Sequence, residues 1–323
     1  MKEHWPRHVP VVKLDAAAVE ALVLPFFPGN RILSIEPVKG GLINTNLKIR
    51  LSKRPGAVLL RLYQRGVAPA EKEMAVYRLV AGHVPVPHFI HFSPKSSIAG
   101  HPYALIDWIE GCELQAMFAS LSAEKIVDLG YAIGRMLARI HAFHFDQFGF
   151  LDSNLKVAAP IDLDREGMLH YLKDCFIEGP GRERLGEKLT FALIEYASRR
   201  GDSLSQWPQP TLVHGDFNGS NILIRRPAGV WEIAAVIDWE YALSASPAFD
   251  FGNLLRPPLD NNPKFSASLA RGYREGGGFL PQNWEAIARL ADMFSFADIL
   301  SRPATNTVVI EDAKAVIAKL LAS

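Results

Sequence analysis

The hydrophobic pattern of the chain changes near residue 108, and this change limits the fold class more than any other feature of the sequence. Before it, "RILSIEPVKGG", "LINTNLKIRLS" and "AVLLRLY" are rich in strand-forming residues and are separated by turn sequences, which predicts an antiparallel meander. After it, apolar residues recur mainly at helical spacing, interrupted by two strand pieces around 212–224 and 232–239. The sequence therefore predicts an α+β protein whose β-rich first third is followed by a mainly helical remainder.

A chain of 323 residues exceeds the size at which a single hydrophobic core usually stops growing, roughly 250 to 300 residues. We therefore expect two lobes, an N-lobe of residues 1–107 and a C-lobe of residues 108–323. Within the N-lobe, residues 14–24 and 71–81 carry apolar positions at helical spacing. In contrast, "YALIDWIEG" at 103–111 is typical of a buried strand that runs into a turn.

The charge balance argues against nucleic acid and anionic membranes as partners. The sequence has 35 Lys and Arg against 34 Asp and Glu, a formal charge of +1, which creates no global field. The first residues lack the apolar block of a signal peptide, and no segment approaches the roughly 20 apolar residues of a membrane span. The two distant cysteines, Cys112 and Cys175, fit a reducing compartment. We therefore expect a cytoplasmic protein.

Polar side chains gather in "LVHGDFNGSNILI", residues 212–224, between two apolar runs that are typical of short buried strands. The polar residues must then form a loop at the strand ends, where catalytic groups are often placed. Downstream, "WEIAAVIDWEYA" brings Asp238 to the end of another apolar strand, and "RRPAGV" is suited to the hairpin turn between the strands. Pairing of these strands would bring Asp238 close to Asp216 and Asn221.

These three side chains suit phosphoryl transfer. Asn221 and Asp238 offer hard oxygen ligands of the kind that Mg²⁺ prefers, with positions left for water and phosphate oxygens. Asp216 can then accept a proton from a hydroxyl nucleophile. For His214 we favour a packed, hydrogen-bonded side chain that supports the loop, and for Asp250 a capping or bracing role, over direct chemistry.

The chain resembles the aminoglycoside phosphotransferase and choline kinase group, small-molecule kinases related to protein kinases. The resemblance follows the order of "GGLINTN", "VLLRLY", "EKEMAVYRLV", "YALIDWIEG", "HGDFNGSN" and "VIDWE" along nearly the whole chain. The last two segments are the most specific. The resemblance implies a two-lobed, protein-kinase-like fold with a nucleotide-binding N-lobe and a C-lobe that carries the catalytic loop and the substrate-binding helices.

The resemblance also implies roles for single residues. Asp216 would be the catalytic acid that orients or deprotonates the acceptor hydroxyl, and Asn221 and Asp238 would hold Mg²⁺. Arg61 would contact the α- and β-phosphates, and Glu73 would be the helix carboxylate that pairs with it. Protein kinases have Lys at the Arg61 position, and the two side chains are not interchangeable.

Two further segments would contact the nucleotide. Gly40, Gly41 and Asn44 match the loop over the phosphates, where missing side chains permit close backbone approach. Asp107 and Ile109 stand at the hinge, where backbone groups would meet the adenine edge. The family often has Phe or Tyr after the metal-binding Asp, whereas Trp and Glu follow it here.

The predicted function is transfer of the γ-phosphoryl group of ATP, or of GTP, to a hydroxyl of a small molecule. From residue 239 onward the chain has nine acidic and eight basic residues, so no acidic pocket for a polycationic aminoglycoside is indicated. An antibiotic and a metabolic acceptor such as an amino alcohol, a sugar or homoserine therefore stay open. The alternative from another class is a nucleotide-binding pseudokinase or scaffold. The sequence does not predict the oligomeric state.

Overall fold

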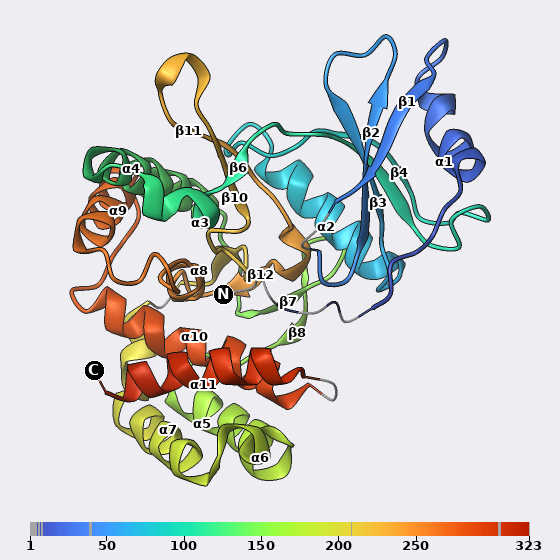
Figure 1. Cartoon of the computed structure of the whole chain (residues 1–323). Coiled ribbons are helices and arrows are strands. Elements are labelled where there is room, and N and C mark those ends of the chain that lie inside the picture. The colour runs from blue at the N-terminus through green and yellow to red at the C-terminus, as the bar shows by residue number, and fades with distance from the viewer. Residues whose placement is uncertain are drawn as a thin grey trace.

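The computed structural model describes residues 5 and 7 and residues 9–38, 41–207, 209–302 and 305–322. A sheet with two flanking helices forms one side of the molecule, and most of the later helices lie on the other side (Figure 1). This arrangement confirms the α+β class. The division into lobes at residue 107 coincides with the end of a strand and stays a prediction.

The predicted meander is present as an antiparallel sheet. Its strand order is β1-β2-β3-β5-β4. The strands are β1 (Ile32–Pro37), β2 (Thr45–Leu51), β3 (Ala57–Leu62), β4 (Phe89–Ser93) and β5 (Tyr103–Asp107). Strand β3 lies at the centre and is buried along almost its whole length, which places Arg61 inside the protein.

Two helices accompany the sheet. Helix α1 (Ala16–Val23) confirms the predicted helix at 14–24, and Asp15 caps it by accepting a hydrogen bond from the Ala18 backbone N–H at 2.8 Å. Apolar residues of α1 share one core cluster with β2, β3 and β5. Helix α2 (Val67–Val80) begins four residues before the predicted start, directly after Gly66, and carries Glu73 inward.

The remainder of the chain is mainly helical, as predicted. Helices α4 (Ala123–Ile140) and α9 (Pro263–Glu275) pack closely against each other, and α10 (Trp284–Ser301) packs against α8 (Ala248–Leu254). The other helices are α3 (Leu114–Met117), α5 (Arg165–Lys173), α6 (Gly181–Leu185), α7 (Glu187–Arg200) and α11 (Thr307–Leu321). Within the described ranges, no helix is long and apolar enough to cross a membrane.

The expectation of two strand pieces in this region was incomplete. One sheet has the order β11-β10-β6, and a second has the order β8-β7-β12-β9. Their strands are β6 (Cys112–Glu113), β7 (Gly149–Leu151), β8 (Val157–Pro160), β9 (Thr211–Val213), β10 (Ile222–Arg225), β11 (Glu232–Val236) and β12 (Leu243–Ala245). Strands of two to four residues are too short to show a periodicity in sequence, which is why they were missed.

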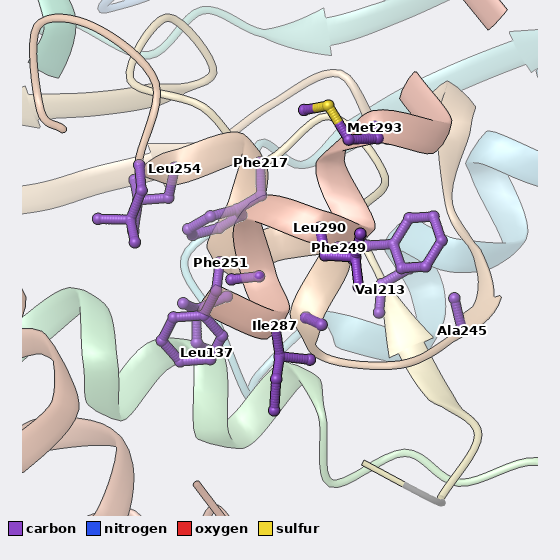
Figure 2. Packing of buried hydrophobic residues seen from close by; sticks show 14 of the residues in the cluster. Leu137, Val213, Phe217, Ala245, Phe249, Phe251, Leu254, Ile287, Leu290 and Met293 are labelled. Carbon is purple, nitrogen blue, oxygen red and sulfur yellow. The ribbon is translucent and has the colours of Figure 1, made fainter. Parts of the chain in front are cut away.

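The core lies directly beneath the loop between β9 and β10. Figure 2 shows Phe217 of this loop close to side chains of α4, α8 and α10. The labelled cluster consists of Leu137, Val213, Phe217, Ala245, Phe249, Phe251, Leu254, Ile287, Leu290 and Met293. Because protein cores are densely packed, this apolar base holds the polar loop in one position.

Candidate active site

The loop between β9 and β10 places the Asp216 carboxylate between two amides. Asn218 Nδ2 donates to Asp216 Oδ1 at 2.9 Å, and Asn221 Nδ2 donates to Asp216 Oδ2 at 3.0 Å. The structure thus brings Asp216 and Asn221 together, as the sequence predicted. Because the amide nitrogen of Asn221 is used on Asp216, its Oδ1 atom is the one that can accept from other partners. The contribution of Asn218 was not predicted.

Asp250 of α8 braces the start of this loop. Its Oδ2 accepts from the His214 backbone N–H at 2.8 Å, and its Oδ1 accepts from the Gly215 backbone N–H at 3.0 Å. Gly215 has a φ of +76°, and a Cβ there would lie 2.4 Å from the Tyr241 carbonyl oxygen. The turn therefore requires glycine. The predicted bracing role of Asp250 is supported by these contacts.

His214 is fully buried and supports the same loop. Its Nδ1 accepts from the Asp216 backbone N–H at 3.2 Å, and its Nε2 lies 2.9 Å from the Ile237 carbonyl oxygen. An acceptor at Nδ1 and a carbonyl at Nε2 together fix the neutral tautomer with the proton on Nε2. His214 therefore connects the loop to the residue before Asp238, which agrees with the structural role favoured from the sequence.

Antiparallel pairing of β10 with β11 brings Asp238 to the loop. Ile222 is opposite Val236, and the Ile237 N–H donates to the Asn221 carbonyl at 3.0 Å. Asp238 has a φ of +70°, in the left-handed region that few non-glycine residues other than Asn and Asp adopt. Asp216, Asn221 and Asp238 all line one cavity of about 430 Å³. The hairpin predicted from the sequence is confirmed.

Arg61 connects the sheet to this segment. Its Nη2 lies 2.6 Å from Asp238 Oδ1, 3.6 Å from Glu73 Oε1 and 4.0 Å from Glu240 Oε2. Arg61 and Glu73 are buried. The structure therefore brings together the predicted Arg61 and Glu73 pair, but the closest acid to Arg61 is Asp238.

This cluster of one arginine and three acids shifts the pKa values of its members. Burial lowers the pKa of Arg61, but Glu73 and Asp238 outweigh it, so the net pKa is raised. Burial raises the pKa of Glu73 to about 7, because repulsion from Asp238 and Glu240 adds to it and Arg61 only partly opposes it. Burial, and then Asp238, also raise the pKa of Glu240. Of these groups, Glu73 therefore has a pKa near neutral pH.

Glu240 is a site residue that the sequence argument missed. It lines the cavity and accepts from Asn44 Nδ2 at 3.1 Å. Its position two residues after Asp238, in the turn that follows β11, could have indicated it. From the sequence, Glu240 was noted only as a departure from the family pattern. Lys72 of α2 holds this segment in place by donating to the Ala242 carbonyl at 3.0 Å.

The predicted phosphate loop is only partly described. Gly40 lies outside the described residues, whereas Gly41 and Asn44 line the cavity. Asn44 Oδ1 accepts from the Gln64 backbone N–H at 3.2 Å, which fixes its side chain together with the contact to Glu240. The loop carbonyls of Gly41 and Asn44 accept from the guanidinium of Arg7, another residue that was not predicted.

The two predicted hinge residues are not among the described residues that line this cavity. The Asp107 carboxylate pairs with Arg54, and its backbone N–H donates to the His88 carbonyl at 2.9 Å. Ile109 follows in the connection between β5 and β6 and is half-buried. Their role at the adenine edge stays a prediction.

Comparisons with known proteins agree with this geometry. Residues 34–290 match the model described as "Phosphotransferase enzyme family". Among solved structures, aminoglycoside phosphotransferase APH(4)-Ia is similar with a TM-score of 0.69 and 17% identity, over 95% of this chain and 99% of that chain. The GDP and kanamycin complex of APH(2'')-IIia has a TM-score of 0.69 and 17% identity, over 94% of this chain and 98% of that chain. These likenesses confirm the predicted protein-kinase-like fold.

A ternary complex of a thermostable APH(4)-Ia mutant with AMP-PNP and hygromycin B has a TM-score of 0.68 and 18% identity, over 94% of this chain and 98% of that chain. One curated relative, acyl-CoA dehydrogenase family member 10 from Mus musculus, is 25% identical over 228 residues, or 70% of this chain. The match covers 19% of that relative, so the chain spans about one fifth of its length.

Proposed function

Because the chain belongs to the phosphotransferase enzyme family, we propose that it transfers the γ-phosphoryl group of ATP to a hydroxyl of a small molecule, with GTP as the alternative donor. One observation carries the proposal. Asp216, Asn221 and Asp238 line the same cavity as Arg61, so a proton acceptor, hard oxygen ligands and a fixed cation surround one space. Solved relatives of this fold were crystallised with AMP-PNP or GDP.

Asn221 and Asp238 would hold Mg²⁺. Their amide and carboxylate oxygens are the hard donors that this ion takes, and the nearby Glu240 adds a third. Among the described residues, no three His, Cys, Asp or Glu side chains are grouped so that they could hold a metal ion by themselves. Phosphate oxygens and water would therefore have to supply the remaining ligands of Mg²⁺. Bound Mg²⁺ would neutralise the charge of the phosphates.

The chain's own residues would bind and orient the nucleotide. Arg61 offers a buried guanidinium for the α- and β-phosphates, and Glu73 helps to hold it. The backbone of Gly40 and Gly41 with the Asn44 side chain would cover the phosphates. Backbone groups of the hinge residues Asp107 and Ile109 would meet the base.

Asp216 would act on the acceptor. Two amide donors fix its carboxylate, and it faces the cavity next to Asn221. A carboxylate held in this way can accept the hydroxyl proton as the oxygen attacks the phosphorus, and it orients that hydroxyl beforehand. It need not contact the nucleotide to do so.

The test is the variant Asp216→Asn, which keeps the shape of the side chain and removes its charge. Positioned general bases contribute about 10² to 10⁴ in rate, so we expect kcat to fall within that range in an assay of ATP consumption over a panel of hydroxylated acceptors. The affinity for Mg²⁺ and ATP, measured by calorimetry, should stay within a few fold of wild type.

The matched variant Asp238→Asn should show the opposite pattern, with weaker nucleotide binding in the presence of Mg²⁺. If Asp216→Asn lost nucleotide binding and kept its kcat at saturating ATP, the roles of the two acids would have to be exchanged. Nucleotide binding by the wild type without consumption of ATP for any acceptor would favour the pseudokinase alternative.

A further inference from the structure

One wall of the cavity is formed by the face of a single helix. Ser295, Asp298 and Ile299 of α10 line the cavity together with Arg302, the residue that ends this helix. Their spacing of three and four residues places them on one helix face. This wall belongs to α10 and not to the N-terminal sheet that carries Arg61, and it lines the same cavity as Asp216. We therefore expect the acceptor to bind against it.

Arg256 belongs to the same wall, and the acid that neutralises it lies behind it. Arg256 Nε donates to Asp292 Oδ2 at 2.9 Å, and Nη2 donates to Asp292 Oδ1. Both side chains are buried, yet Arg256 lines the cavity, whereas Asp292 is not among the described residues that do. The guanidinium also lies over the Phe296 ring at 4.6 Å. It is therefore rigid and presents its positive side to the cavity.

The contact between Arg256 and Asp292 leaves some N–H donors of the guanidinium for a ligand. A guanidinium carries five N–H donors, and the contact with Asp292 uses two of them along the edge formed by Nε and Nη2. Three donors, including both on Nη1, are not used by that contact. Asn253, with 1% of its surface exposed, lines the cavity beside Arg256. Burial lowers the pKa of Arg256, but Asp292 and, more weakly, Asp216 outweigh it, so the carboxylate of Asp216 lies within electrostatic reach.

We propose that Arg256 binds an anionic group of the acceptor, a carboxylate or a phosphate, while Asp216 receives the acceptor hydroxyl. This inference rests on the proposed kinase function and names its acceptor class as hydroxylated anions. Arginine is well suited to such a contact, because its planar fork matches the geometry of both anions. Here the fork is already oriented by Asp292, so little conformational entropy is lost on binding.

The same wall is unsuited to a polycation. Asp298 is an acid of the α10 face, and its Oδ2 already accepts from Arg302 Nε at 3.0 Å. A polycationic aminoglycoside would have to displace this arginine and would also meet the positive side of Arg256. The other acids of the lining, Glu113, Asp216, Asp238 and Glu240, lie outside this wall. At the wall itself two arginines accompany one acid, so electrostatic complementarity there favours an acceptor group that carries negative charge.

The first experiment compares matched acceptors with the wild-type protein. ATP consumption is measured with straight-chain hydroxy carboxylates of three to six carbons, with the primary amide of each, with hydroxylated phosphate monoesters and with kanamycin. We expect kcat/KM to be at least 10-fold higher for the anions than for their amides. The carboxylate and phosphate arms show which of the two anions the site takes.

The second experiment assigns the effect to Arg256. Hydrogen bonds to charged groups are strong enough that Arg256→Gln should raise KM for the anionic acceptor about 10- to 100-fold. KM for the amide and for ATP should change little. Since this variant leaves a buried acid without its partner, the double variant Arg256→Gln with Asp292→Asn provides a folded neutral pair. Arg289→Gln is the control, because Arg289 pairs with Glu285 on the same helix and is outside the cavity lining.

Calorimetric titration of the same anions into ADP-loaded protein separates the two proposals. Binding that depends on Arg256 without any ATP consumption would support the anion site and contradict the kinase function. Turnover of amides or kanamycin at a kcat/KM equal to that of the anions would overturn the acceptor class and leave the kinase function standing. A loss of kcat in the double variant that is equal for anions and amides would make Arg256 purely structural and overturn the inference.

Discussion

Glu73 shows how a single residue can make this site sensitive to pH. It is fully buried, 3.6 Å from Arg61, and two further acids of the cluster lie nearby. A buried carboxylate favours its protonated form when nearby positive charges and hydrogen bonds do not offset the loss of hydration. The free energy of unfolding should therefore respond to the protonation of this one group.

We predict that this dependence disappears in Glu73→Gln. Burial raises the pKa of Glu73 from the ordinary value of 4.5 to about 7, so the folded state binds the proton more tightly than the unfolded state. The stabilisation is fully present below about pH 4.5 and is lost as the pH rises through 7. Urea unfolding at several pH values should show the wild type losing about 3 kcal/mol relative to the variant.

The control for this measurement is Glu71→Gln, a change of the same type on the same helix. Its unfolding curve should keep the pH dependence of the wild type. A Glu73→Gln protein whose stability follows the wild type between pH 5 and pH 8 would show that Arg61 keeps Glu73 charged throughout.

At the scale of elements, the pair α4 and α9 supports the loop between β9 and β10 through Asp250. The hydroxyl of Tyr273 in α9 lies 3.0 Å from His141 Nδ1. The other ring nitrogen, His141 Nε2, lies 3.2 Å from Asp250 Oδ2. Asp250 in turn holds the loop that carries Asp216. The close approach of the two helices depends on small residues, because a Cβ at Gly134 would lie 2.1 Å from the Leu269 carbonyl oxygen.

Gly134→Ala should therefore separate the helices and destabilise the protein. Overpacking typically costs about 1 to 3 kcal/mol, and the better helix propensity of alanine returns at most about 1 kcal/mol. We expect the Tm to fall by about 2 to 6 °C in a calorimetric scan. Arg135→Ala, on the exposed side of the same helix, should leave the Tm within about 1 °C. An unchanged Tm in Gly134→Ala would mean that the helices can shift without cost.

At the scale of the whole molecule, two residues near the start of the chain connect its two parts. Arg7 Nη2 donates to the carbonyls of Ile43 at 2.7 Å and Asn44 at 3.1 Å, in the predicted phosphate loop. Trp5 Nε1 donates to Asp312 Oδ2 of α11 at 2.8 Å, and its ring lines the cavity. Trp5 and Arg7 therefore contact α11 on one side of the cavity and the predicted phosphate loop on the other.

Removing the first of these contacts should loosen the phosphate loop. Arg7→Ala deletes several hydrogen bonds of about 1 kcal/mol each, and we expect KM for ATP to rise about 3- to 20-fold with kcat largely kept. Steady-state kinetics on the purified full chain measure both values. Arg31→Ala removes an exposed arginine at the start of β1 and should change neither. An ATP KM that is equal in wild type and Arg7→Ala would show that the loop holds its position without Arg7.

Local features of the sequence determined the meander β1 to β3, helix α1, the β10 to β11 hairpin and the meeting of Asp216 with Asn221. Strand periodicity, a capping Asp15 and a turn sequence act over a few residues, so each can be recognised without knowing the fold. The protein-kinase-like class and most of the candidate residues followed from the resemblance to a known family, which rests on the order of such local motifs. The short strands of the C-terminal part were not predicted, because a few residues are too few to show the alternation of apolar and polar side chains that identifies a strand.

Apart from the Arg61 and Glu73 pair, which the family resemblance implied, only the tertiary structure decided which charges meet. Arg61 and Asp238 are 177 residues apart, and Arg256 and Asp292 are 36 apart. Nothing in a local pattern selects one arginine and one acid among 35 basic and 34 acidic residues. These pairs arise because packing of the sheet and helices removes the side chains from water, and a buried charge must then find a partner. The raised pKa of Glu73 and the positive side of Arg256 are consequences of that burial, so they become visible only in the folded chain.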